Sequence, residues 1–166
     1  MKSAGPMDAQ APTLFFLHVP KAGGTTFHQI IARQFPAGAA YNLYAYSTAK
    51  AVTAYKQLPL EQRRAYRLVK GHMPFGLHEF AGRPSTYITI LRRPVERVVS
   101  YYYYVLASPE HYLHAQVTKK RISLADFAAS PLSIELDNGQ TRQLAAAQGQ
   151  RLEAPVGALP AEALEA

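Results

Sequence analysis

Apolar runs and amphipathic segments alternate through the first two thirds of the chain. Residues 14–19 form an apolar run typical of a buried strand, and residues 67–70 and 86–91 are two further strand candidates. Helical patterns follow the first and third of these runs, at residues 25–35 and 95–106. Strands that alternate with helices predict an α/β fold with a central parallel sheet and crossover helices.

Turn and cap signals complete the predicted arrangement. We expect residues 39–47 to form a loop, because they are rich in alanine and tyrosine and have only weak periodicity. Ser123, with Asp126 three positions later, resembles a capping box. Further helices are expected at Ser47 or Thr48 to Gln57, Pro59 to Ala65, Pro109 to Val117, Ser123 to Ala129, Gln140 to Ala147, and from Pro160 onward.

A basic side chain that can bind a ligand or take part in catalysis follows each of the three predicted strands. Lys21 comes after the first strand, His72 after the second and Arg92 after the third. The carboxyl ends of parallel strands meet at one edge of a sheet, where ligands bind. We therefore expect these three side chains to lie close together.

The segment after the first strand has the composition of an anion-binding turn. Gly23 and Gly24 allow a tight turn and a close approach of the backbone to a ligand, and Thr25 or Thr26 can cap the next helix. Free N–H groups, the positive end of the helix dipole and Lys21 together suit a phosphate or sulfate. The alternative is a simple strand-to-helix turn with a surface lysine. Because the lysine precedes the glycines, the spacing argues against a Walker loop and hence against an ATPase or GTPase.

Composition and charge restrict the class of partner. The 166 residues suit one domain, at residues 13–166, after a flexible lead at residues 1–12. No apolar run is long enough for a transmembrane helix and no signal-peptide layout is present, so we expect a cytoplasmic protein. The absence of cysteine excludes disulfides and thiolate catalysis. A net charge of +7 predicts an anionic partner, but the scattered basic residues do not indicate nucleic acid.

Three segments together resemble a known family. They are His-Val-Pro-Lys-Ala-Gly-Gly-Thr-Thr at 18–26, Lys-Gly-His at 70–72, and Leu-Arg-Arg-Pro-Val-Glu-Arg-Val-Val-Ser followed by four tyrosines at 91–104. In this order and spacing they resemble sulfotransferase family 2, the relatives of heparan sulfate 2-O-sulfotransferase. Residues 137–144 also resemble bacterial members. Full-length relatives continue further, so the resemblance implies the N-terminal portion of the family domain, incomplete at its C-terminus.

The resemblance implies a P-loop-like three-layer fold and 3′-phosphoadenosine 5′-phosphosulfate (PAPS) as sulfuryl donor. It places Arg92 and Ser100 at the 3′-phosphate, and His72 at the position of a catalytic histidine. Lys21 would also be catalytic, by stabilising the leaving phosphate. The residues implied to bind the 5′-phosphosulfate are Lys21, Ala22, Gly23, Gly24, Thr25 and Thr26. Heparan-type members have His-Gly-His where this chain has Lys-Gly-His, and the family usually has an aspartate where this chain has Arg93.

Elementary chemistry supports these roles independently. Sulfuryl transfer, like phosphoryl transfer, needs an in-line acceptor and stabilisation of charge on the transferring and leaving groups, which Lys21 and loop N–H groups can supply. A neutral His72 can take a proton from a hydroxyl, and the planar guanidinium of Arg92 suits a phosphate. Ser100 lies about two helical turns, at roughly 3.6 residues each, after the first helical residue, so it can face the strand end.

Structural roles are the alternatives for the same residues. His72 and His18 can be hydrogen-bonded structural histidines, Arg92 a surface charge, and Ser100 a partner of its own helix backbone. The four tyrosines at 101–104 are expected mainly to pack. Two further residues of the chain, Asn138 and Arg142, are candidates to approach the donor or acceptor, and His111 and His114 lack the further ligands that a metal site needs.

The leading hypothesis is therefore a PAPS-dependent sulfotransferase that acts on a hydroxyl of a carbohydrate, without a metal. One alternative is a non-catalytic nucleotide- or anion-binding module, or a truncated inactive fragment. Another is a nucleotide kinase of related fold, which would require a lysine after the glycines and a carboxylate for magnesium. The oligomeric state is left open.

Overall fold

The computed structural model describes residues 11–44, 48–146 and 157. Within them, four parallel strands form one sheet in the order β2-β3-β1-β4, with helices interleaved along the chain. The predicted α/β class with a central parallel sheet is confirmed. The strands are β1 (Thr13–Leu17), β2 (Ala40–Leu43), β3 (Leu68–Gly71) and β4 (Ser85–Thr89).

Strand β1 lies inside the sheet, between β3 and β4. Phe15 of β1 is in register with Val69 on one side and Tyr87 on the other. Phe15 and Phe16 point to opposite faces of the sheet, and both are completely buried. A strand buried on both faces requires a continuous apolar run, which is why β1 was evident from the sequence. The loop that follows β1 consequently begins between the ends of two neighbouring strands.

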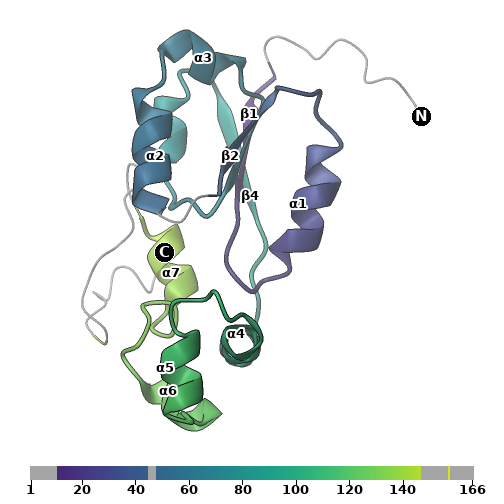
Figure 1. Ribbon diagram of the computed structural model, residues 1–166. Helices are drawn as coiled ribbons and strands as arrows, with labels where there is room; N and C mark the ends of the chain where they lie inside the picture. The colour runs from purple at the N-terminus through teal and green to yellow at the C-terminus, as the bar shows by residue number, and fades with distance from the viewer. Residues whose placement is uncertain (1–10, 45–47, 147–156, 158–166) are drawn as a thin grey trace.

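Helices cover both faces of the sheet and produce three layers (Figure 1). On one face, Phe16 packs against Phe27 with a ring-centroid distance of 4.9 Å. On the other face, Phe15 meets Tyr55 edge-on at 6.5 Å. The helices that supply these layers are α1 (Gly24–Ala32) on the first face, and α2 (Thr48–Gln57) and α3 (Leu60–Ala65) on the second.

A second group of helices lies beyond the carboxyl ends of the strands (Figure 1). Tyr101, Val105 and Phe127 belong to its own apolar cluster. The buried guanidinium of Arg97 joins this group to the rest of the fold, because Nη1 lies 3.0 Å from a carboxylate oxygen of Glu135 and 3.5 Å from the carbonyl oxygen of the loop residue Pro20. The helices are α4 (Pro94–Ala107), α5 (His114–Lys119), α6 (Leu124–Ala129) and α7 (Gly139–Leu144).

Two of the predicted elements were wrong. The expected loop at 39–47 contains β2, which pairs with β3 along its whole length. The expected helix at Pro109–Val117 begins only at His114, because residues 109–113 form turns in which His111 N–H donates to the Ser108 carbonyl at 3.0 Å. A short 3-10 helix, η1 (Leu77–Phe80), was not predicted.

The remaining predicted helices and strands are confirmed with shifts of a few residues at their ends. Ser123 caps α6 as predicted, since its Oγ accepts the N–H of Asp126 at 3.1 Å. The helix expected from Pro160 lies outside the described residues. Among the helices that the structure describes, none is both long enough and apolar enough to cross a membrane.

Candidate active site

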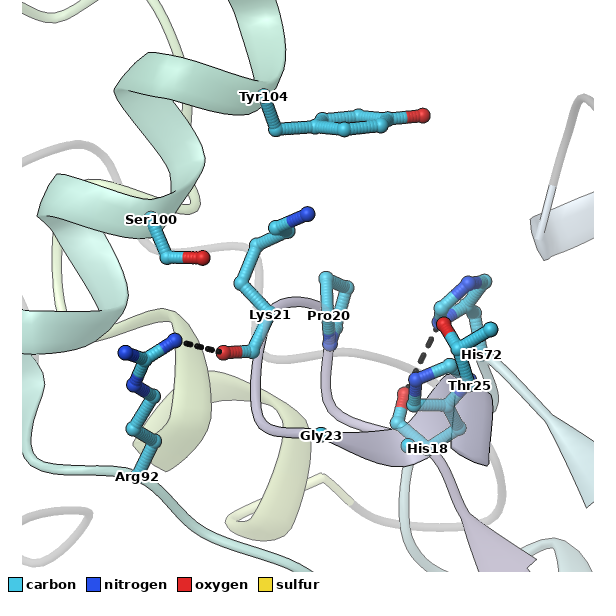
Figure 2. Close-up of a pocket in the computed structure, with 10 residues that line it drawn as sticks. His18, Pro20, Lys21, Gly23, Thr25, His72, Arg92, Ser100 and Tyr104 are labelled. Carbon is cyan, nitrogen blue, oxygen red and sulfur yellow. Dashed lines mark hydrogen bonds between the residues drawn. The ribbon is translucent and has the colours of Figure 1, made fainter. Parts of the chain in front are cut away.

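A pocket of about 360 Å³ opens at the carboxyl edge of the sheet, between the loop after β1 and helix α4. The three strand-end residues Lys21, His72 and Arg92 all line it, together with Ser100. Ala22 is buried outside the pocket lining, as its 5 % exposure shows. Figure 2 shows Lys21, Arg92 and Ser100 on one side of Pro20, and His18, Thr25 and His72 on the other, with the ring of Tyr104 above Lys21 and Pro20.

The loop after β1 has an unusual backbone. Lys21 has φ 66° and Gly23 has φ 85°, both in the left-handed region. For a residue with a side chain this region costs about 1–2 kcal/mol, so the Lys21 conformation depends on its surroundings. One such contact comes from Arg92, whose Nη1 donates to the Lys21 carbonyl oxygen at 3.3 Å. Gly24 is required for a different reason, because a Cβ there would lie 2.0 Å from the His18 ring.

The N-terminus of α1 faces the pocket. Gly23 occupies the N-cap position, and Gly24 and Thr25 of the first helical turn line the pocket. The expectation that Thr25 or Thr26 caps this helix was wrong, because both lie inside the first turn; Thr26 also lies outside the pocket lining. A glycine cap has no side-chain oxygen, so the first N–H groups keep their capacity to bind an anion at the positive end of the helix dipole.

Two cationic side chains stand beside this helix end. The Nζ of Lys21 lies 3.9 Å from the centroid of the Tyr104 ring, a cation–π contact. Burial, and then the nearby Arg92 charge, lower the pKa of Lys21. Glu96 is a surface ion-pair partner of Arg92, at 3.7 Å. The backbone of Arg92 is fixed by Gln140, whose amide accepts the Arg92 N–H at 3.0 Å and donates to the Arg92 carbonyl at 2.9 Å.

His72 is oriented as a proton acceptor on the opposite side. Its Nδ1 lies 3.0 Å from the carbonyl oxygen of His18, which can only accept, so Nδ1 carries the proton and Nε2 keeps a free lone pair. Burial lowers the pKa of His72, and the hydrogen bond to His18 opposes this only in part. The ring stacks on that of His18 at 4.5 Å. His72 is therefore neutral at pH 7 and held in one tautomer.

A network of basic and aromatic side chains surrounds the His18 ring. The Tyr44 hydroxyl lies 2.9 Å from Nδ1 of His18 and 3.1 Å from Nδ1 of His28, and the Lys70 ammonium lies 3.0 Å from Nε2 of His28. Burial is the main cause that lowers the pKa of His18 to about 4, followed by the nearby His72 and His28. His18 is thus neutral at pH 7, and it also lines the pocket.

A family comparison agrees with this geometry. Residues 7–133, most of the chain, match the model of a sulfotransferase family. The chain belongs to the sulfotransferase family. This family in general uses PAPS as sulfuryl donor. No curated protein and no solved structure matches the chain.

Two residues that the sequence nominated as site candidates lie outside this pocket. Arg142 is completely buried and forms an ion pair with Asp137, and its Nε also donates to the Asp137 carbonyl at 2.8 Å. Asn138 is the N-cap residue of α7, with φ 51°. Neither lines the pocket. Both residues instead form the start of α7.

One residue that lines the pocket, and two that bond to residues lining it, were not foreseen. Tyr104 was expected to pack, but it is 42 % exposed and lines the pocket. Gln140 and Gln143 stand in a segment that resembles bacterial sulfotransferases, yet an uncharged amide gave no reason to single them out. Among the described residues, no group of three or more histidine, aspartate or glutamate side chains could hold a metal ion.

Proposed function

We propose that this protein is a PAPS-dependent sulfotransferase that transfers a sulfuryl group to a hydroxyl of a carbohydrate acceptor. One observation carries the proposal: a single pocket is lined by two cations, by the N-terminus of α1, and by a neutral, oriented histidine on the side away from the cations. The cations are Lys21 and Arg92, and the histidine is His72. Sulfuryl transfer needs these two kinds of group on either side of the reacting sulfur.

The residues of the pocket fit an anionic donor. Lys21, the N–H groups of Gly24 and Thr25, and the dipole of α1 suit a phosphosulfate, and the absence of a side chain at Gly23 leaves the helix end accessible. The guanidinium of Arg92 and the hydroxyl of Ser100 suit the separate 3′-phosphate. PAPS, when bound, supplies an activated sulfuryl group with a phosphate as its leaving group.

The chain's own residues account for the movement of protons and charge. His72 Nε2 accepts the proton of the acceptor hydroxyl while the hydroxyl oxygen bonds to sulfur and the bond from sulfur to the phosphate oxygen breaks. The bond electrons stay on the phosphate, and Lys21 and the α1 N–H groups stabilise the negative charge that develops there. The products are a sulfate ester, 3′-phosphoadenosine 5′-phosphate (PAP) and a protonated His72, which returns its proton to water.

Radiolabelled transfer from PAPS to a panel of neutral and acidic saccharides tests this function. His72→Ala should retain PAP affinity and lose transfer by about 10²–10⁴-fold, the usual contribution of a general base. Lys21→Ala should lower turnover much more than it lowers stability. Donor binding without transfer to any hydroxyl acceptor would contradict the enzymatic proposal and favour a non-catalytic nucleotide-binding module. Unchanged turnover in Lys21→Ala would remove this lysine from the mechanism.

A further inference from the structure

Two glutamines of helix α7 hydrogen-bond to the backbone on both sides of the pocket. Gln140 and Gln143 are three positions apart, so they lie on the same face of the helix. The family match ends at residue 133, before this helix begins. Neither side chain lines the pocket, so any effect on the reaction must pass through the residues that they contact.

Gln140 fixes the backbone of the arginine on the donor side. Arg92 lies between β4 and α4, outside both elements. Its N–H donates to Oε1 of Gln140 at 3.0 Å, and its carbonyl accepts from Nε2 of Gln140 at 2.9 Å. One side-chain amide thus satisfies both polar groups of the Arg92 backbone. This pair of bonds sets the point from which the guanidinium extends into the pocket.

Gln143 fixes the backbone around the base. Its side chain is almost completely buried, and Nε2 donates to the carbonyl of Met73 at 2.8 Å and to that of His18 at 3.2 Å. The His18 carbonyl also accepts the Nδ1–H of His72, and a carbonyl has two lone pairs for these two donors. The Gln143 carbonyl accepts the N–H of Phe75 at 2.9 Å. Gln143 therefore joins the loops that follow β1 and β3.

We propose that α7 sets the distance between the donor-binding arginine and the base, with Gln140 and Gln143 as positioning residues. Gln140 acts through Arg92, and Gln143 acts through the His18 carbonyl on His72. The inference rests on the function proposed above. The ion pair between Arg142 and Asp137 closes the turn at the start of the helix that carries both glutamines. Because one short helix carries both glutamines, a displacement of α7 would move the backbone on both sides of the pocket.

Three measurements separate the two glutamines. Thr141→Ala is the matched control, because among the described residues the Thr141 side chain has no hydrogen bond, and it belongs to the same helix. Gln140→Leu should speed hydrogen exchange of the Arg92 amide and weaken PAP binding, measured by calorimetry, on the order of tenfold. The apparent pKa of His72 should stay that of wild type.

Gln143→Leu should have the complementary effect. PAP affinity should change by less than about twofold, whereas kcat falls at least about tenfold, the value of one lost hydrogen bond. A less confined His72 is more solvated, so its pKa should rise toward the ordinary value, as NMR titration of the ring can show. The other titratable groups around this ring are His18, Tyr44 and Glu135, none of which is changed. Gln143→Met retains the side-chain volume and serves if the leucine variant does not fold.

The outcomes also distinguish this inference from the proposed function. Amide exchange at Arg92 and titration of His72 are measured on the ligand-free protein, so they decide the positioning roles even if wild type binds no PAP. If the wild-type protein bound no PAP, the proposed function would be refuted, but the positioning roles would not. The positioning roles would be overturned if both glutamine variants behaved like Thr141→Ala in all these measurements. They would also be overturned if each variant lowered PAP affinity and kcat by the same factor.

Discussion

Replacement of Gly24 by alanine tests the close packing between α1 and the histidine pair. A Cβ at this position would lie 2.0 Å from Cδ2 and 2.1 Å from Nε2 of the His18 ring. Carbon atoms rest at about 3.5–4.0 Å, so the ring must move. It is confined between Phe16 and His72, with ring-centroid distances of 5.6 and 4.5 Å. We therefore expect a loss of stability and a displacement of His72.

Two opposing effects set the magnitude of this loss. An extra methyl group in a well-packed site costs about 1–3 kcal/mol. Alanine is favoured over glycine inside a helix by up to about 1 kcal/mol, and by less at the first helical residue. The free energy of unfolding should therefore fall by about 1–2 kcal/mol. In a chain of this size, each kcal/mol of lost stability lowers the Tm by about 2–4 °C, so the Tm should fall by about 2–8 °C.

Thermal unfolding and NMR of the histidine rings measure the two consequences. Gly23→Ala is the control, because no atom lies within 4 Å of a Cβ there and only its φ of 85° opposes a side chain. Both variants should lose stability, but only Gly24→Ala should shift the ring signals of His18 and His72. A Gly24→Ala protein with the Tm and ring signals of wild type would refute the packing argument.

Three further predictions concern pH, the pocket wall and the buried ion pair. The pKa of His18 is lowered to about 4 in the folded protein, so below pH 6.5 the unfolded chain binds more protons than the folded chain. The free energy of unfolding, measured in urea, should therefore fall by up to about 3 kcal/mol as the pH is lowered from 6.5 to 4. A pH dependence identical to that of His18→Asn would contradict this. Tyr104→Leu should raise the KM for PAPS about 2–5-fold by removing the cation–π contact of Lys21, while Tyr104→Phe remains near wild type; equal values for the two would exclude a role for the ring. Arg142→Leu leaves the Asp137 carboxylate without its ion-pair partner and should lower the free energy of unfolding, measured by thermal unfolding, by about 3 kcal/mol. Arg93→Leu at the surface should change it by less than about 0.5 kcal/mol. Similar losses in the two variants would argue against a stabilising role of the Arg142 ion pair.

Strands β1, β3 and β4 were predictable from the sequence, and β2 was not. The run at β1 is apolar on both faces because both faces are buried, and that pattern is visible without a structure. In β2, Leu43 is buried but Asn42 is exposed, and among the described residues the strand pairs only with β3. Its four residues have no clear alternation. Its extended form depends on the neighbouring strand, a tertiary contact that local sequence does not record.

The charged residues of the pocket were also easier to predict than the hydrogen bonds that orient them. Lys21, His72 and Arg92 follow strand ends, so the topology of a parallel sheet brings them to one edge. The hydrogen bonds that orient them come from backbone carbonyls and from Gln140 and Gln143, far away in sequence. Amides carry no charge and occur on many surfaces, so only the folded structure shows which of them bond to the residues around the pocket.

Calorimetric titration with PAP, with ATP as the competing nucleotide, tests the central claim most directly. Arg92→Ala and Arg93→Ala form a matched pair, because Arg92 lines the pocket, whereas the side chain of Arg93 is 87 % exposed and pairs only with Glu96 at the surface among the described residues. The account predicts that wild type and Arg93→Ala bind PAP with similar affinity and prefer it to ATP. Arg92→Ala should bind about 10–100-fold more weakly, the value of a hydrogen bond to a charged group. No binding by the folded wild type, or equal losses in the two variants, would contradict a donor site at this pocket.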